Sequence, residues 1–213
     1  MKLQMINYTK SIKKKTILDN ININLSSGNI YGFYGRNGSG KTMLFRALCT
    51  LIFPDSGDVL IDDVSIINDD YDLRNFGVLL ENPSFYPYLS GFDNLKLLYE
   101  INNKKNDEYI NKILNEIGLE DVKNKKFKEY SLGMKQKLRI AQAYMENQKI
   151  IILDEPTNGL DEKSVENIRK IINNLKKQNK IILIASHNKD DLRILCNKIF
   201  KIEEGKIIGE IKL

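Results

Sequence analysis

The sequence predicts an α/β fold in which strands and helices alternate along much of the chain. A glycine-rich loop at residues 35–42 follows an apolar run of strand length and precedes a helix-length segment, which forms a strand–loop–helix unit. After residue 147, apolar strand-length runs again alternate with amphipathic segments. Residues 83–147 between these parts are almost entirely helical in pattern. We therefore expect a helical subdomain inserted into an otherwise alternating fold.

The individual elements follow from apolar periodicity and turn residues. The alternation of Leu3 and Met5, and then of Ile17, Ile21, Ile23 and Leu25, predicts short antiparallel strands before a turn at residues 26–28. Further strands are expected at 30–34, 59–61, 76–80, 150–153 and 180–185, with a final pair at 199–202 and 206–211. Helices are expected at 41–51, 93–101, 107–117, 133–146, 162–176 and 189–196.

Length and charge limit the number of domains and the partners. A chain of 213 residues is long enough for one core with an inserted subdomain but too short for two complete domains of this class, so we expect 1–213 to be a single domain.

The net charge of +5 is spread along the chain, with dense basic clusters at 13–15 and 123–128. We interpret these as solvated surface, with an anionic membrane face as an open alternative. Neither cluster carries a series of aromatic side chains, so no nucleic acid is expected.

The apolar runs are far shorter than the roughly 18 residues that would span a bilayer. No charged start leads into an apolar signal segment, and the two cysteines, Cys49 and Cys196, lack metal-ligand spacing. We therefore expect a reducing cytoplasm and two packed thiols.

The strongest chemical signal is a phosphate-binding loop that fits G-x-x-x-x-G-K-[ST]. It consists of Gly35, Arg36, Asn37, Gly38, Ser39, Gly40, Lys41 and Thr42. The glycines let backbone N–H groups surround phosphate oxygens, Lys41 supplies a positive charge to the β- and γ-phosphates, and the Thr42 hydroxyl can bind Mg²⁺. The motif predicts a nucleotide site that uses Mg²⁺.

Two further strand ends carry polar side chains. Asp154 and Glu155 end an aliphatic strand, where Asp154 would hold Mg²⁺ through water and Glu155 would act as general base for the attacking water. The alternative is that the two acids simply end the strand before Pro156.

His187 is the only histidine and follows the strand expected at 180–185. Since that strand is expected beside 150–153, we predict that the imidazole lies near the γ-phosphate.

A second phosphate-binding helix N-terminus is predicted at Ser131 and Gly133, between the loop and the acidic strand end. One chain then carries two half-sites. Their natural use is a head-to-tail dimer, in which each nucleotide lies between the phosphate loop of one copy and the Ser131/Gly133 element of the other.

Together these motifs resemble the nucleotide-binding subunit of an ATP-binding cassette (ABC) transporter over nearly the whole chain. The phosphate loop, Ser131-x-Gly133, residues 153–156, residues 158–161 and Ser186-His187 occur in the family's order and approximate spacing. The resemblance implies a P-loop NTPase fold of the ABC ATPase type, with a RecA-like core, an N-terminal antiparallel β subdomain and an inserted α-helical subdomain. It also implies ATP and Mg²⁺ as ligands and ATP hydrolysis as the activity.

The resemblance also implies roles for single residues. Asp161 would lie at the dimer interface, Ser131 and Gly133 would close on the γ-phosphate of the partner's ATP, and His187 would contact that phosphate within its own subunit. Glu81 stands where the family usually has a glutamine and would be a further metal ligand, unless it is neutral drift in a solvent-facing loop.

Several departures from the family pattern are informative. Leu132 and Met134 replace the first glycine and the glutamine of the usual Leu-Ser-Gly-Gly-Gln signature. Together with Glu81 and residues 85–91, they resemble the bacitracin-type and lantibiotic-immunity branch of ABC exporters.

Two more departures affect the nucleotide itself. Ile12 stands where an aromatic ring normally stacks on adenine, which makes strict adenine selectivity doubtful unless Tyr8 or Tyr34 reaches the base instead. Met43 is expected to border the nucleotide, but it replaces a hydroxyl residue of many relatives and so removes a contact to the α-phosphate.

We therefore predict an ATPase subunit that dimerises on ATP, as a homodimer or with a paired subunit, and drives a separate transmembrane permease. It would associate with the cytoplasmic face of the membrane through that permease, and the exported cargo would be a peptide antibiotic or a similar amphipathic compound. One alternative is a soluble ABC-type ATPase, for example in iron–sulfur assembly. Another is a regulatory nucleotide-binding module without turnover, which the presence of Glu155 and His187 argues against.

Overall fold

The computed structural model describes residues 1–68, 71–80 and 85–213. Its strands are β1 (Lys2–Ile12), β2 (Lys15–Ser26), β3 (Asn29–Tyr34), β4 (Ser56–Ile61), β5 (Val64–Ser65), β6 (Phe76–Leu79), β7 (Ile150–Asp154), β8 (Ile181–Ser186), β9 (Lys198–Glu203) and β10 (Lys206–Lys212). Its α-helices are α1 (Lys41–Leu48), α2 (Gly91–Tyr99), α3 (Asp107–Glu116), α4 (Leu132–Tyr144), α5 (Glu162–Lys177) and α6 (Lys189–Leu195).

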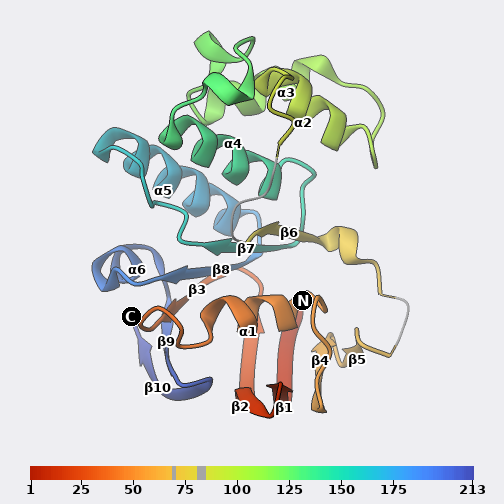
Figure 1. Cartoon of the computed structure of the whole chain (residues 1–213), viewed down its shortest axis with the longest axis vertical. Helices are drawn as coiled ribbons and strands as arrows, with labels where there is room; N and C mark the ends of the chain where they lie inside the picture. The colour runs from red at the N-terminus through yellow and green to blue at the C-terminus, as the bar shows by residue number, and fades with distance from the viewer. Residues whose placement is uncertain (69–70, 81–84) are drawn as a thin grey trace.

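Two sheets form the framework (Figure 1). The larger sheet has the strand order β10-β9-β3-β8-β7-β6, and the smaller has the order β2-β1-β4-β5. Neighbours from β6 through β7, β8 and β3 to β9 are parallel, whereas β10 and the smaller sheet pair antiparallel. The predicted α/β class, the N-terminal antiparallel strands and the final strand pair are confirmed. Because parallel neighbours end at one edge, the residues that follow β3, β7 and β8 lie close together.

The larger sheet is covered on both faces, which explains why its inner strands are apolar throughout. Ile150 and Ile152 of β7 pack in a core shared with α1 and the smaller sheet. Ile151 and Leu153 face the opposite core, shared with α4 and α5. Figure 1 shows the same layers, with α1 below the larger sheet and α4 and α5 above it.

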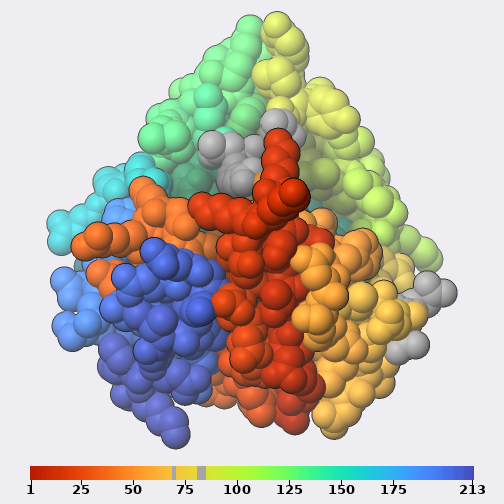
Figure 2. All heavy atoms as spheres, turned by 60° about the horizontal axis from the view of Figure 1, so that its bottom comes forward, coloured from red at the N-terminus to blue at the C-terminus, as the bar shows by residue number. Residues whose placement is uncertain are grey.

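The smaller sheet forms a ridge along one face of the molecule. Figure 2 shows red β1 and β2 between the blue C-terminal strands and the orange β4 region. β1 and β2 are joined by Lys13 and Lys14, whose φ angles of 50° and 66° are both positive. This is the turn geometry that matches the twist of a two-residue hairpin, although asparagine and glycine are the usual residues there.

Helices α2, α3 and α4 lie together at the top of Figure 1. Ile110 and Ile113 of α3 and Leu138 of α4 are buried in the core on that side of the sheet. Ser90 caps α2 by accepting a 3.0 Å hydrogen bond from the Asp93 N–H, which is why the helix begins before the predicted residue 93. Within the described residues, no helix has the length and apolar character to cross a bilayer.

Other boundaries also differ from the prediction. The first helix ends at Leu48 and not at 51, because the chain turns at Thr50 with a φ of 55°. The two-residue strand β5 was not predicted. Cys49 and Cys196 are both buried, and burial raises the pKa of each thiol to about 12, which confirms the predicted packed thiols.

Candidate active site

The glycine loop joins the end of β3 to the start of α1. Gly40 is the N-cap residue of α1, and its φ of 109° lies in the region that favours glycine. A Cβ atom on Gly35 would overlap the carbonyl oxygen of Ile202 and the Ser39 hydroxyl. Glycine is therefore required at both positions. The loop ends at a helix N-terminus, where backbone N–H groups and the helix dipole together favour phosphate.

The turn between β9 and β10 supports this loop. The Gly205 N–H donates to the Ser39 carbonyl oxygen at 2.9 Å, and the Gly205 carbonyl accepts from the Asp19 N–H at 2.9 Å. Gly205 has a φ of 74°, and a Cβ atom there would overlap the Ile17 carbonyl oxygen. The sequence predicts only a turn here, because nothing local indicates that this turn reaches the phosphate loop.

Two side chains of the loop fit a triphosphate. Lys41 is 7% exposed and donates from Nζ to the carbonyl oxygens of Gly35 at 2.7 Å and Arg36 at 3.2 Å. The Ser39 Oγ is buried and has no hydrogen-bond partner among the residues that the structure describes. A buried hydroxyl without a partner is costly, and a phosphate oxygen would satisfy it.

Thr42 and Asp154 come together from α1 and β7. The Thr42 Oγ1 donates to the Asp154 Oδ2 at 2.6 Å. Hydroxyl and carboxylate oxygens are the donors that Mg²⁺ prefers, and Mg²⁺ in nucleotide sites needs few protein ligands besides phosphate and water. The residues present therefore fit this ion. Glu81, the third predicted ligand, lies outside the described residues.

Glu155 follows β7 and has a φ of 49°, an uncommon backbone conformation for a residue with a side chain. Its carboxylate accepts hydrogen bonds from the His187 N–H at 2.9 Å and from the Ser186 Oγ at 3.3 Å. The His187 Nδ1 also lies 2.9 Å from the Glu155 Oε1. The strands β7 and β8 are parallel neighbours, as predicted, and the structure pairs Asp154 with Ala185. Here the imidazole binds Glu155, so its contact with a γ-phosphate stays a prediction.

The phosphate loop, the start of α1 and the end of β7 border a cavity of about 850 Å³. Among the predicted site residues, it is lined by Asn37, Gly38, Gly40, Lys41, Thr42, Met43, Asp154 and Glu155. The other lining residues were not assigned to the site from the sequence, although Leu132 and Asn158 belong to motifs named there. They are Lys15, Thr16, Ile17, Leu132, Gln136, Arg139, Asn158, Glu204 and Gly205. The spacing of Leu132, Gln136 and Arg139 along α4 was visible in the sequence, but which helix face turns to the loop depends on tertiary packing.

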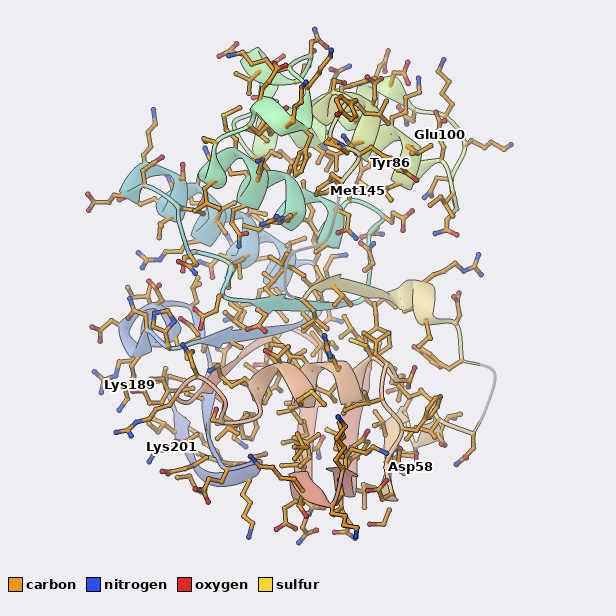
Figure 3. The ribbon with its side chains drawn as sticks, viewed as in Figure 1. Asp58, Tyr86, Glu100, Met145, Lys189 and Lys201 are labelled. Carbon is orange, nitrogen blue, oxygen red and sulfur yellow. The ribbon has the colours of Figure 1, made fainter. Side chains whose placement is uncertain are left out.

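No aromatic side chain lines this cavity among the described residues. Ile12 is 41% exposed at the end of β1 and pairs with Lys15, which does line the cavity. Tyr8 is fully buried, and its hydroxyl donates to the Ile52 carbonyl oxygen at 2.8 Å. Tyr34 packs on the opposite core, with the Lys189 Nζ 6.0 Å from its ring centroid; Figure 3 labels Lys189 near α6. Neither tyrosine therefore replaces the missing ring.

The second half-site does not line the cavity. Ser131 caps α4 by accepting from the Met134 N–H at 3.2 Å. A Cβ atom on Gly133 would lie 3.2 Å from the Gly159 carbonyl oxygen, so the helix start packs tightly on that turn. Asp161 caps α5, and the backbone N–H and hydroxyl of Ser164 that donate to its carboxylate lower its pKa. Ser131, Gly133 and Asp161 thus belong to a surface beside the cavity.

Comparisons with known proteins agree with this geometry. The sequence profile of the family described as "ABC transporter" matches residues 18–158. The chain is 41% identical over 205 residues to the uncharacterized ABC transporter ATP-binding protein YybJ of Bacillus subtilis, covering 96% of this chain and 94% of that protein. It is 37% identical to the lantibiotic transport ATP-binding protein SrtF of Streptococcus pyogenes, covering 98% and 90%. It is 38% identical to the bacitracin transport ATP-binding protein BcrA of Bacillus licheniformis, covering 95% and 67%.

A solved structure is similar over the full length. The dimeric structure of MJ0796, a bacterial ABC transporter cassette, matches with a TM-score of 0.91 and 26% identity, covering 99% of this chain and 98% of that one. A dimeric post-hydrolysis state of the same cassette, bound to ADP and Pi, matches with the same TM-score and identity.

Proposed function

Because the chain belongs to the ABC transporter family and is the ATP-binding subunit of such a transporter, we propose that it powers the export of a peptide antibiotic or a similar amphipathic compound. The chain is an ATPase, and subunits of this family dimerise and work with a transmembrane permease. In our proposal it uses Mg²⁺ and joins the cytoplasmic face of the membrane through that permease.

The proposed hydrolysis follows from the positions of the cavity residues. The loop N–H groups and Lys41 would hold the phosphates. Thr42 and Asp154 would hold Mg²⁺, which would neutralise phosphate charge. Glu155 orients a water molecule and takes its proton as the water oxygen bonds to the γ-phosphorus. The bond from that phosphorus to the bridging oxygen breaks, and ADP is the leaving group. Ser186 and His187 fix the carboxylate of Glu155 by hydrogen bonds.

The proposed assembly is a head-to-tail pair of cassettes. Ser131 and Gly133 do not line the cavity of their own chain, although the start of α4 has the form of a second anion site. A second copy would bring its own Ser131 and Gly133 to the nucleotide in the cavity of the first copy, and Asp161 would lie at the interface between the two copies. The dimeric MJ0796 cassette is the precedent for such a pair.

The proposed docking surface for the permease is on the helical part of the chain. Tyr86, Tyr88 and Ile101 are large apolar side chains that are 60%, 71% and 71% exposed. Figure 3 shows Tyr86 among the upper helices, far from Asp58 on β4. The Phe127 N–H donates to the Leu89 carbonyl oxygen at 2.9 Å, which holds the segment at residues 86–89 against the helical part. Large apolar side chains that stay exposed favour a protein partner.

The cargo class is inferred from relatives. SrtF is named for lantibiotic transport and BcrA for bacitracin transport, and both are similar to this chain over at least 95% of its length. The substitutions Leu132 and Met134 in the signature are the features that we associate with the same branch.

The observation that carries the proposal is the 2.6 Å contact between Thr42 and Asp154, with Glu155 next in the chain. The test is Glu155→Gln, which should bind ATP, hydrolyse it negligibly and accumulate as an ATP-bound dimer. Glu108→Gln is the matched control, because Glu108 lies in the exposed first turn of α3. Size-exclusion chromatography and phosphate release with MgATP decide the matter. A Glu155→Gln variant that stays monomeric, or hydrolyses at the parent rate, would refute the assignment.

A further inference from the structure

Gln136 is a buried polar side chain that connects α4 to the catalytic strand end. It is 9% exposed, and its Nε2 donates to the carbonyl oxygens of Glu155 at 3.1 Å and of Pro156 at 3.2 Å. Two carbonyl acceptors fix the orientation of the amide, since only its NH₂ group can donate to them. The side chain therefore binds the backbone at the residue that we assign as general base.

The backbone of Glu155 needs such support. A residue with a side chain and a φ of 49° has an unfavourable backbone conformation, which persists only where its surroundings hold it. Its N–H donates to the Ala185 carbonyl oxygen at 2.9 Å, and its carbonyl accepts from the Asn158 N–H at 3.2 Å. The hydrogen bond from Gln136 is a third one to the Glu155 backbone. It comes from α4, whereas the other two come from β8 and from the turn itself.

A second contact joins the same two segments. The turn at residues 155–160 passes the first turn of α4, where Gly133 lies close to the Gly159 carbonyl oxygen. A Cβ atom on Gly159 would lie 3.0 Å from the Leu132 Cδ2. The 155–160 turn is therefore in contact with α4 at two places, separated by about one helical turn.

We infer that Gln136 is a positioning residue, which makes the placement of the Glu155 carboxylate depend on the position of α4. Ser131 begins this helix and lies five residues before Gln136, about 7.5 Å along the helix axis. A shift of α4 when Ser131 engages the partner's nucleotide is then transmitted through the Gln136 amide to the backbone of Glu155. This inference rests on the proposed roles of Glu155 and Ser131.

The test is Gln136→Met, which keeps the length of the side chain and removes the donor. We expect kcat for MgATP to fall about tenfold to a hundredfold, because misplacing a reacting group by about 1 Å costs up to about a hundredfold. KM and ADP affinity should stay within about twofold, and the variant should still form ATP-bound dimers. Gln142→Met is the matched control, because Gln142 lies on the same helix and does not line the cavity.

A merely structural role predicts a different result. Loss of ADP binding or of ATP-dependent dimers in Gln136→Met, or a parental kcat, would overturn the inference. If Gln136→Met does not fold, Gln136→Asn carries the same test, since it keeps the amide but is one methylene shorter. In a Glu155→Gln background, Gln136→Met should change neither the residual turnover nor the dimer, because the two residues act on one step.

The outcomes also separate this inference from the proposed function. If Glu155→Gln hydrolyses ATP like the parent, the proposed mechanism of hydrolysis fails. If Glu155→Gln is inactive while Gln136→Met turns over like the parent, the inference alone fails.

Discussion

Base selectivity at the nucleotide cavity offers the most direct test of the missing aromatic ring. Ile12 and Lys15 are cross-strand partners, and Lys15 lines the cavity. Directly paired residues point to the same face of a sheet with Cβ atoms about 5 Å apart. A ring introduced at Ile12 would therefore lie beside Lys15 at the mouth of the cavity, where a nucleobase can stack on it.

The size of the effect follows from the exposure of this position. Base–aromatic stacking contributes about 1–3 kcal/mol. Ile12 is 41% exposed, so a new ring would remain partly in water and the lower value applies. About 1 kcal/mol corresponds to roughly fivefold tighter binding. Every base has a π-face, so ATP and GTP should both gain.

The assay is equilibrium titration of ATP and GTP against the parent, Ile12→Tyr and the aliphatic control Ile12→Leu. In the parent, the two affinities should differ by less than about tenfold, which is roughly 1.4 kcal/mol. Ile12→Tyr should bind both nucleotides about fivefold more tightly, and Ile12→Leu should match the parent. A strong ATP preference in the parent would refute the reasoning, as would an Ile12→Tyr variant that binds no better than Ile12→Leu.

Three other substitutions test separate parts of the chain. Gly77→Ala should lower the free energy of unfolding by about 3 kcal/mol, because the new Cβ would overlap the Ala143 carbonyl oxygen. The control Gly209→Ala should be near neutral, because the space around Gly209 is open. Equal unfolding midpoints of the two variants in urea would contradict this. The pKa of Asp161 is lower in the folded chain than its unfolded value of about 3.9, so its ionised carboxylate stabilises the fold above that value, and this stability is lost as the pH falls through the folded pKa. In Asp161→Asn, the melting temperature should therefore fall less steeply with decreasing pH than in the parent. Identical plots of melting temperature against pH would count against this. Glu81→Gln should reduce transport, or resistance in cells, more than ATP hydrolysis; equal losses would make Glu81 chiefly catalytic, and no loss would leave it without a special role.

The sequence predicted those parts of the site that rest on local patterns. The glycine loop, Lys41 and Thr42 form a motif of fixed spacing, and an aliphatic run that ends in Asp154 indicates a buried parallel strand. The carboxyl ends of parallel strands lie at one edge of the sheet, so the sequence also predicts that Thr42 and Asp154 lie close together.

Other parts depend on contacts between distant residues and had no local signal. Gln136 lies in an ordinary amphipathic helix, and its hydrogen bonds to residues 155 and 156 depend on how α4 packs on β7. Thr50 ends α1 in a left-handed conformation that asparagine or glycine usually adopts, so the predicted helix ran too long. Ile12 has no local signal of its own, and its importance follows only from the aromatic ring that the family resemblance places at this position.

The hydrogen bond from Gly205 to Ser39 has a consequence for the synthesis of the protein. The phosphate loop is translated early, yet one of its supports lies on the turn between β9 and β10. A growing chain cannot form this hydrogen bond until residue 205 has left the ribosome. Nucleotide that binds the supported loop in preference to the unsupported one stabilises the complete fold by mass action.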